Sequence, residues 1–157
     1  MRHPSRSRQS GFTLIEVTAA IVIMIFAITV TITAFSNFRA RKTMDAAVEQ
    51  VLAVFSQAHL DTISSKDDRA YGVHLDSDKA VYFVAPTYDS ATTTNKIYMI
   101  HPAIEITNVS LAGSTTEIVF QRFTGQTSQT GTFELRVKTN TSISTVVTVQ
   151  GTGSISL

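Results

Sequence analysis

The sequence contains no cysteine. The chain therefore cannot form a disulfide or a thiolate metal site, and its redox compartment stays unspecified. Helix-breaking residues are also scarce near the N-terminus, where no proline occurs between Pro4 and Pro86 and no glycine between Gly11 and Gly72. Since proline and glycine are the residues that most disfavour helix interiors, one helix can run through most of this stretch.

Charge is distributed unevenly along the 157 residues, although the formal net charge is only +1. Arginines occupy positions 2, 6 and 8, no acid precedes Glu16, and no charge of either sign lies between Glu16 and Arg39 or after Lys138. Without its first eleven residues the chain would be slightly acidic. A general electrostatic attraction to nucleic acid is therefore not expected.

The uncharged run from Val17 to Phe38 would form roughly 33 Å of helix, enough to cross a hydrocarbon core of about 30 Å. Beyond it, apolar residues recur at spacings of three and four from Met44 to Ile63, with polar residues including Asp61 assigned to the solvent face. That spacing is the mark of one buried helical face. The sequence predicts one helix from residue 12 to about 64, membrane-spanning first and amphipathic after residue 38.

From residue 70 onward, short runs rich in Val, Ile, Thr, Tyr and Phe are separated by turn sequences such as DSDK at 76–79. This pattern predicts six or seven short antiparallel strands. The fold class is α+β, with the long N-terminal helix packed on an antiparallel β head. A two-sheet sandwich is the leading arrangement, and a single sheet is the alternative.

Common catalytic and nucleotide-binding motifs are missing from this sequence. No GxSxG, Walker loop, HExxH or GxGxxG occurs, so neither an enzyme nor a cofactor is expected. Asp76 and Asp78 lack the ligand spacing and the glycine of a calcium loop and are interpreted as a hairpin turn. His59, His74 and His101 lack paired zinc spacing, and no metal is predicted.

Aromatic residues in the strand segments allow two interpretations. They could form a stacking surface for single strands or sugars, but strand aromatics more often pack in the core or across strands. We therefore assign them to packing. The residues concerned are Tyr71, Tyr82, Phe83, Tyr98, Phe120, Phe123 and Phe133.

Glu16 is unexpected at the start of a membrane helix, because an ionisable group in a bilayer is costly unless it finds a partner. One interpretation is a secretory signal peptide with a cleavage site near residues 34–36, but the uncharged run is too long for one. A plain signal anchor is a second interpretation. It leaves Glu16 unexplained.

The third interpretation rests on GFTLIE, residues 11–16, placed between a short basic leader and the apolar run. This arrangement resembles the class III signal of type IV prepilins and type II secretion pseudoprepilins. The resemblance implies that a prepilin peptidase cuts after Gly11 and methylates the new amino terminus of Phe12. It also implies that Glu16 neutralises the amino terminus of a neighbouring subunit during assembly.

Physical chemistry agrees with such a pairing, since a carboxylate and an ammonium attract strongly in a low-dielectric surrounding, where either one alone is costly. The alternative is that Glu16 merely lies at the membrane edge near the start of its own helix. Basic residues flank both sides of the apolar run, so the positive-inside rule does not decide the orientation. The resemblance implies a cytoplasmic leader and a head outside the cytoplasm.

The sequence pattern and the resemblance together divide the chain into a leader at 1–11, a transmembrane and filament-core helix at 12–38, an amphipathic helix and linker at 39–69, and a β-rich head at 70–157. The order of elements in the head is similar to the GspH/FimT group of minor pseudopilins and pilins. The expected location is the cytoplasmic (inner) membrane, as a single-pass protein, and then a pilus or pseudopilus.

This group implies a minor structural subunit of a type II secretion pseudopilus or a type IV pilus. The implied partners are the prepilin peptidase, other pilins through the N-terminal helix, an inner-membrane platform protein, and the lipid bilayer before assembly. A DNA-uptake subunit and a membrane-anchored adhesin are the alternatives. The last nineteen residues carry no charge, which argues against nucleic-acid binding through the C-terminal tail.

Overall fold

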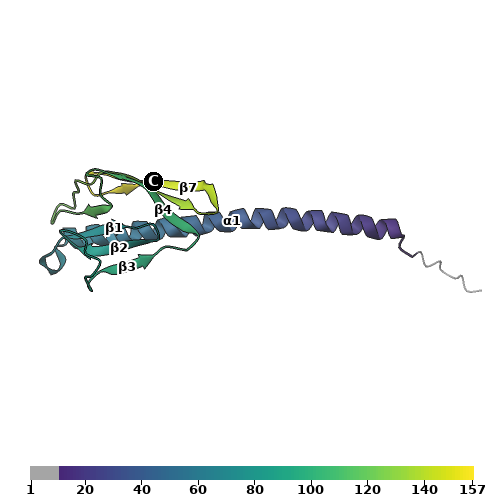
Figure 1. Cartoon of the computed structure of the whole chain (residues 1–157), viewed down its shortest axis with the longest axis horizontal. Helices are drawn as coiled ribbons and strands as arrows, with labels where there is room; N and C mark the ends of the chain where they lie inside the picture. The colour runs from purple at the N-terminus through teal and green to yellow at the C-terminus, as the bar shows by residue number, and fades with distance from the viewer. Residues whose placement is uncertain (1–10) are drawn as a thin grey trace, which may run out of the picture. The chain divides into compact units, whose positions relative to one another are not determined.

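The computed structural model describes residues 11–157, apart from the side chains of residues 32–34. The expected leader lies outside this range except for Gly11. Internal contacts divide the chain into two compact units, Met1–Phe38 and Arg39–Leu157. Helix α1, Leu14–Ile63, contributes residues to both units (Figure 1).

In the first unit, α1 is long and apolar enough to cross a membrane, with a mean hydropathy of 2.5 over its most apolar stretch. The hydroxyl groups of its described threonines form hydrogen bonds within the helix. Those of Thr18, Thr29 and Thr31 donate to backbone carbonyl oxygens one turn earlier, at 2.9, 2.9 and 2.8 Å. A hydroxyl bonded inside the helix needs no water, so these residues suit an apolar environment.

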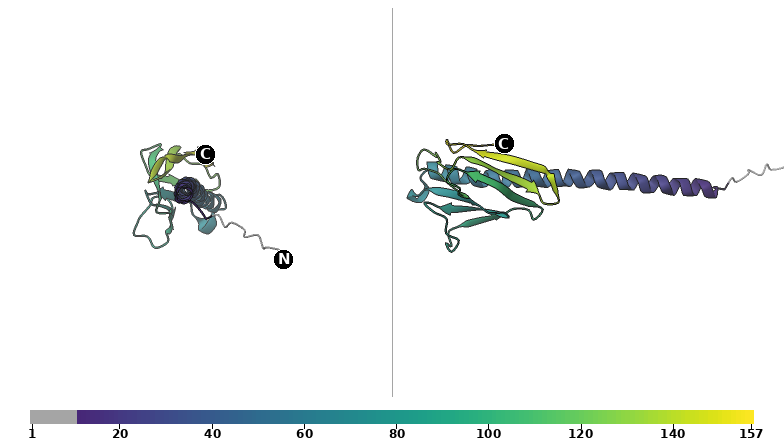
Figure 2. Two further views of the ribbon diagram at one scale, coloured as in Figure 1. Left: turned by 90° about the vertical axis from the view of Figure 1, so that its right-hand side faces the viewer. Right: turned by 45° about the horizontal axis from the view of Figure 1, so that its top comes forward.

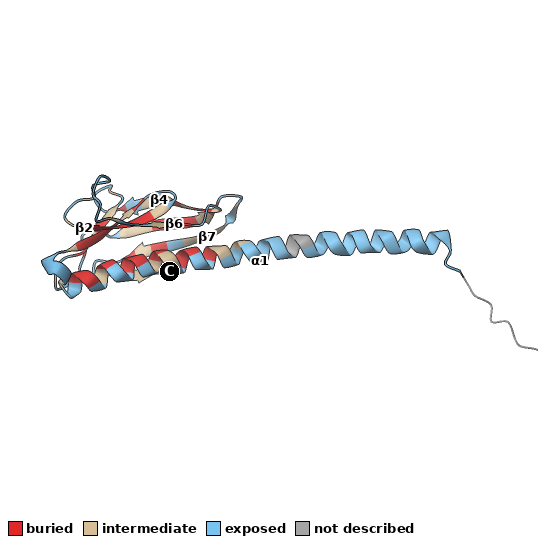
Figure 3. Cartoon of the chain, turned by 90° about the horizontal axis from the view of Figure 1, so that it is seen from below, coloured by how far each residue is buried: buried red, intermediate tan, exposed pale blue. Residues whose placement is uncertain are grey.

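In the second unit, the C-terminal part of α1 buries one face in the core of the head. Met44, Val51 and Phe55 are each at most 3% exposed, and the buried positions recur along one side of the helix (Figure 3). The ring of Phe55 stacks on the ring of Phe133 at a centroid distance of 5.7 Å. Burying residues of this size drives folding through the hydrophobic effect.

The head contains eight strands in two antiparallel four-stranded sheets, ordered β3-β2-β1-β5 and β4-β6-β7-β8. Figure 2 shows the strands beside the C-terminal part of α1. The two-sheet prediction is therefore confirmed over the single sheet. The strands are β1 (Tyr71–Leu75), β2 (Lys79–Val84), β3 (Lys96–Met99), β4 (Ile104–Leu111), β5 (Glu117–Val119), β6 (Gly131–Val137), β7 (Asn140–Val149) and β8 (Ile155–Ser156).

Among the strand aromatics, the prediction of a packed position is wrong for Phe123. Its side chain is 69% exposed, and its φ of 68° lies in the left-handed region. Strand β5 ends at Val119, and the backbone then turns, with Gln121 N–H donating to the carbonyl of Gln126 at 2.8 Å. The turn places Phe123 outside the sheet. Phe120, in contrast, is fully buried.

Strands β1 and β2 are covered on both faces. One face belongs to the core, and on the other Phe83 is 1% exposed. The ring of Tyr88, from the loop between β2 and β3, meets Phe83 edge to face at 5.7 Å and stacks on His74 at 4.0 Å. The Phe83 ring lies so close to position 72 that no side chain larger than hydrogen fits there, and this position is therefore a glycine.

We predict that Gly72→Ala destabilises the head by about 1–3 kcal/mol, the usual cost of overpacking. The added methyl carbon would lie 2.7 Å from both the Ile118 carbonyl oxygen and the Phe83 ring. Denaturant unfolding of the full chain in a neutral detergent measures the change. Gly151→Ala is the control, since its nearest atom would be 3.6 Å away. Equal stability of the two variants would contradict this packing.

Candidate functional site

The start of α1 brings the three residues of the predicted processing and assembly site into little more than one helical turn. Gly11 and Phe12 precede the helix, and Glu16 lies in its first turn. A side chain placed on Gly11 would meet no described atom within 4 Å, and Phe12 is 83% exposed. Among the described residues, no side chain covers the peptide bond between Gly11 and Phe12.

Thr13 directly precedes the first residue of α1 and was not singled out from the sequence. The backbone N–H of Glu16 donates to the Thr13 hydroxyl oxygen at 3.3 Å and to the Thr13 carbonyl oxygen at 3.1 Å. Thr-x-x-Glu is the pattern of a capping box, in which the first side chain satisfies a free N–H group at the helix start. The signal was present as TLIE, residues 13–16, directly before the apolar run.

The Glu16 carboxylate is exposed and has no cation within ion-pair distance among the residues that the structure describes. In the uncut chain Phe12 carries an amide, so a cation one turn before Glu16 exists only after cleavage. From Phe12 to Phe38 the large apolar side chains of the described residues are exposed on every side of α1. A helix apolar all round requires lipid or other helices to cover it.

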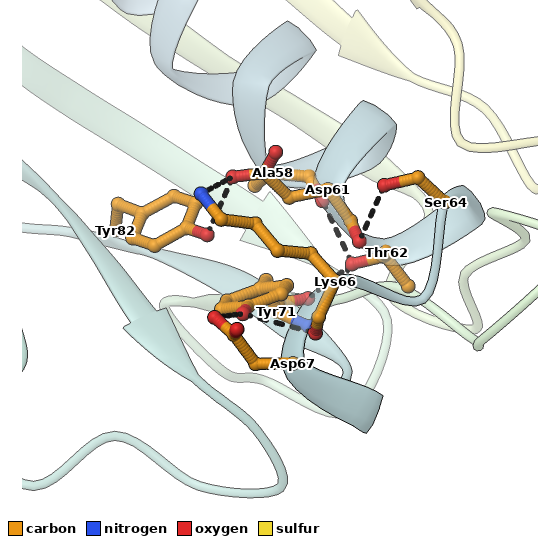
Figure 4. Close-up of polar contacts among 8 residues, drawn as sticks. All are labelled: Ala58, Asp61, Thr62, Ser64, Lys66, Asp67, Tyr71 and Tyr82. Carbon is orange, nitrogen blue, oxygen red and sulfur yellow. Dashed lines mark hydrogen bonds and ion pairs between the residues drawn. The ribbon is translucent and has the colours of Figure 1, made fainter.

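A second polar group lies at the opposite end of α1, where the helix meets β1 and β2 (Figure 4). Asp61 is only 8% exposed, so its assignment to the solvent face is wrong. Its carboxylate accepts a hydrogen bond from the Tyr82 hydroxyl at 2.8 Å and lies 3.3 Å from the Lys66 Nζ. These partners come from β2 and from the turn after the helix, and they make burial of the carboxylate tolerable.

Tyr71 and Thr62 extend this group. The backbone N–H of Tyr71 donates to the Thr62 hydroxyl oxygen at 3.0 Å, and the Thr62 hydroxyl donates to the Ala58 carbonyl at 2.7 Å. The Tyr71 hydroxyl donates toward the Asp67 carboxylate at 3.2 Å, and its ring stacks on Tyr82 at 5.0 Å. The group fastens the end of α1 to the first sheet.

The pKa shifts of Asp61 and Tyr82 indicate that this group has a structural role and not a catalytic one. Burial alone would raise the pKa of Asp61, but hydrogen bonds from Gln57, Tyr82 and Lys66 and the charge of Lys66 lower it below its usual value. Burial, followed by the bond to Asp61, raises the pKa of Tyr82 far above its usual value. A carboxylate that stays ionised and a phenol that stays protonated are poor proton-transfer groups near neutral pH.

The remaining residues considered as ligands are dispersed. The Asp76 carboxylate lies 3.5 Å from the Lys79 Nζ, and the Asp76 N–H donates to the Lys79 carbonyl, so 76–79 forms the predicted hairpin turn. His74 is stacked under Tyr88, and burial lowers its pKa despite the nearby Glu117 carboxylate. Within residues 11–157 no group of three or more His, Asp or Glu side chains is placed to hold a metal ion.

Comparison with known proteins found a matching N-terminal motif and a solved structure of similar fold. The prokaryotic N-terminal methylation motif matches residues 6–34. Among solved structures, the type IV minor pilin FimU of Pseudomonas aeruginosa is similar, with a TM-score of 0.55 and 14% sequence identity over 71% of this chain and 90% of that chain. No curated protein sequence matches this chain.

At 14% identity the likeness to FimU shows the fold, a long N-terminal helix packed on two antiparallel sheets. The motif and the fold together define the class: the chain is a type IV pilin-like protein. Proteins of this fold with this motif are structural subunits and not usually enzymes.

We predict that Asp61→Asn lowers the free energy of unfolding by about 1–3 kcal/mol near pH 7, because it removes a charge-assisted bond. The pKa of Asp61 is lower in the fold than its unfolded value of about 3.9, so its contribution is present above that pH and is lost as pH falls through the folded pKa. Denaturation at about pH 7 and about pH 3 should show the difference shrinking.

The matched control is Asp45→Asn on the same helix. Asp45 is exposed and pairs only with Lys42, at 3.5 Å, among the described residues, so its loss should change stability by less than about 0.5 kcal/mol. An Asp61→Asn variant no less stable than Asp45→Asn at neutral pH would show that the Tyr82 and Lys66 contacts do not stabilise the head.

Proposed function

We propose that this protein is a minor pseudopilin or minor pilin of the GspH/FimT type, a low-copy structural subunit of a type II secretion pseudopilus or a type IV pilus. The observation that carries the proposal is the order of features at the start of α1. Among the described residues, an uncovered Gly11–Phe12 bond is followed, within little more than one turn, by a carboxylate without a cationic partner and then by a helix apolar on every side.

Processing would supply the missing partner of Glu16. A prepilin peptidase would cut after Gly11, and the new amino group of Phe12, once methylated, would remain a cation. Within one chain this cation and Glu16 lie four residues apart. In a bundle of such helices, the amino group of one subunit would pair with Glu16 of its neighbour, so that neither charge is left alone in an apolar surrounding.

Assembly would also account for the exposed apolar surface. Before assembly the bilayer would cover residues 12–38, with the leader in the cytoplasm and the head outside the inner membrane. Extraction by the platform protein into a filament would then exchange lipid contacts for helix contacts. The likeness of the chain's fold to a protein described as a type IV minor pilin supports a minor rather than a bulk subunit.

The first test is the mass of the mature protein. Purified from membranes of cells that carry a prepilin peptidase, the chain should begin at Phe12 and carry one methyl group on its amino terminus. Gly11→Ala keeps a small residue before the cut bond and should still be processed, whereas the bulky Gly11→Leu should block cutting. A chain that retains Met1, or that begins near Asn37, would refute the proposed processing and favour an ordinary anchor or signal peptide.

The second test separates the charge of Glu16 from its place in the helix cap. We predict that Glu16→Gln abolishes incorporation into filaments as completely as Glu16→Ala, because glutamine can serve at this capping-box position but carries no charge. Thr13→Ala removes the hydroxyl that caps the helix and keeps the charge. It should therefore leave incorporation largely intact, at a cost of about 1 kcal/mol in helix stability.

Filament incorporation is read by shearing, pelleting and immunoblotting, with cleavage checked by mass. If Glu16→Gln assembles normally while Thr13→Ala fails, the residue acts as a local cap and the assembly role is lost. If the native chain is processed but never enters filaments, a membrane-anchored adhesin explains it better than a pilin subunit.

A further inference from the structure

A cavity of about 490 Å³ opens in the head beside the end of α1, between the turn that follows the helix and strands β2 and β3. Helix α1 ends at Ile63, and Ser65, Asp67 and Asp68 then take left-handed backbone conformations, with φ of 50°, 51° and 61°. The turn formed by these residues lies across the cavity from the end of β2, at Tyr82 and Val84, and from the start of β3, at Lys96. The volume lies in the range of small-molecule sites.

Positive charge dominates the lining of this cavity. Lys66, Arg69 and Lys96 line it, against the single carboxylate of Asp67. Lys66 is engaged by Asp61, but neither Arg69 nor Lys96 has an acid within ion-pair distance among residues 11–157. Two cations without a counter-charge in one concave site are arranged to attract an anion.

Two of the cations that line the cavity are held by contacts within the protein itself. The Lys66 Nζ lies 3.3 Å from Asp61, and the Lys96 Nζ lies over the Tyr82 ring, 5.3 Å from its centroid. Fixing cations in advance lowers the entropy cost of binding. Lys66 and Lys96 are thus positioned before any ligand binds, and the exposed Arg69 lines the same cavity.

The same contacts restrict the kind of ligand. Tyr82 is stacked by Tyr71 on one side and contacted by Lys96, so its ring is not free to stack on a nucleobase. The Thr94 hydroxyl and the Asp67 carboxylate also line the cavity and can bond to hydroxyl groups. The cavity thus offers cations that can bind an acidic group and polar groups that can bind hydroxyls. This combination matches a sugar that carries a negative charge.

We propose that this cavity binds an acidic monosaccharide unit through its carboxylate or phosphate, with Arg69 and Lys96 contacting the anionic group. The site lies wholly within the second unit, Arg39–Leu157, and does not depend on filament assembly. Carboxylated sugars and sugar phosphates share the anionic group, and the experiment distinguishes them.

The test uses the full chain in neutral-detergent micelles, followed by amide NMR shifts during titration. The probes are galacturonate, glucose 6-phosphate, inorganic phosphate and uncharged galactose. One or both anionic sugars should shift residues 64–71 and 94–96 with millimolar affinity. Arg69→Gln/Lys96→Gln should weaken binding at least about tenfold. Arg41→Gln/Lys138→Gln, which removes the same charge elsewhere, should not weaken it.

Retention of dispersed spectra shows that the variants are folded. Equal affinity for galactose, equal weakening in the control pair, or no shifts up to about 20 mM ligand would overturn the proposal. Inorganic phosphate binding as tightly as glucose 6-phosphate would overturn the sugar assignment, because the anion alone would then account for the affinity.

Discussion

A carboxylate at the start of an apolar helix is the constraint on which the functional account depends. In a low-dielectric surrounding an unpaired charge is costly, and Glu16 has no cationic partner among the described residues of its own chain. Cleavage before Phe12 would create a cation where none existed. The helix would then be suited to lipid or to a bundle of similar helices, and the charge pair would favour one register between neighbours.

The C-terminal part of the same helix obeys a different constraint, since it must fit the core of the head. Apolar residues such as Phe55 occupy one face, and Asp61 at the end of that face is held by Tyr82 and Lys66. The chain leaves the helix immediately afterwards through left-handed turns. In that exit Lys66 contacts Asp61 and Asp67 contacts Tyr71, and both also line the charged cavity.

The sequence predicts most of this fold because its signals are local. Spacings of three and four indicate the helix, and alternation indicates most strands. Strand β8 was missed because it has two residues, and β7 begins at Asn140, within a polar stretch that resembles a loop. Gly11, Phe12 and Glu16 could be proposed as a site because the motif that carries the resemblance lies within six consecutive residues. Burial of Asp61 was missed because its partner Tyr82 is 21 residues away.

The proposed contact between Glu16 and a neighbouring helix can be tested by placing a photo-crosslinking amino acid at Ile15 in the full chain within living cells. Cross-linked products would be isolated and identified by mass spectrometry. The account predicts adducts to proteins that themselves begin with a methylated residue after a removed leader, joined through their first helical turn. Adducts to lipid alone, in cells with intact filaments, would contradict it.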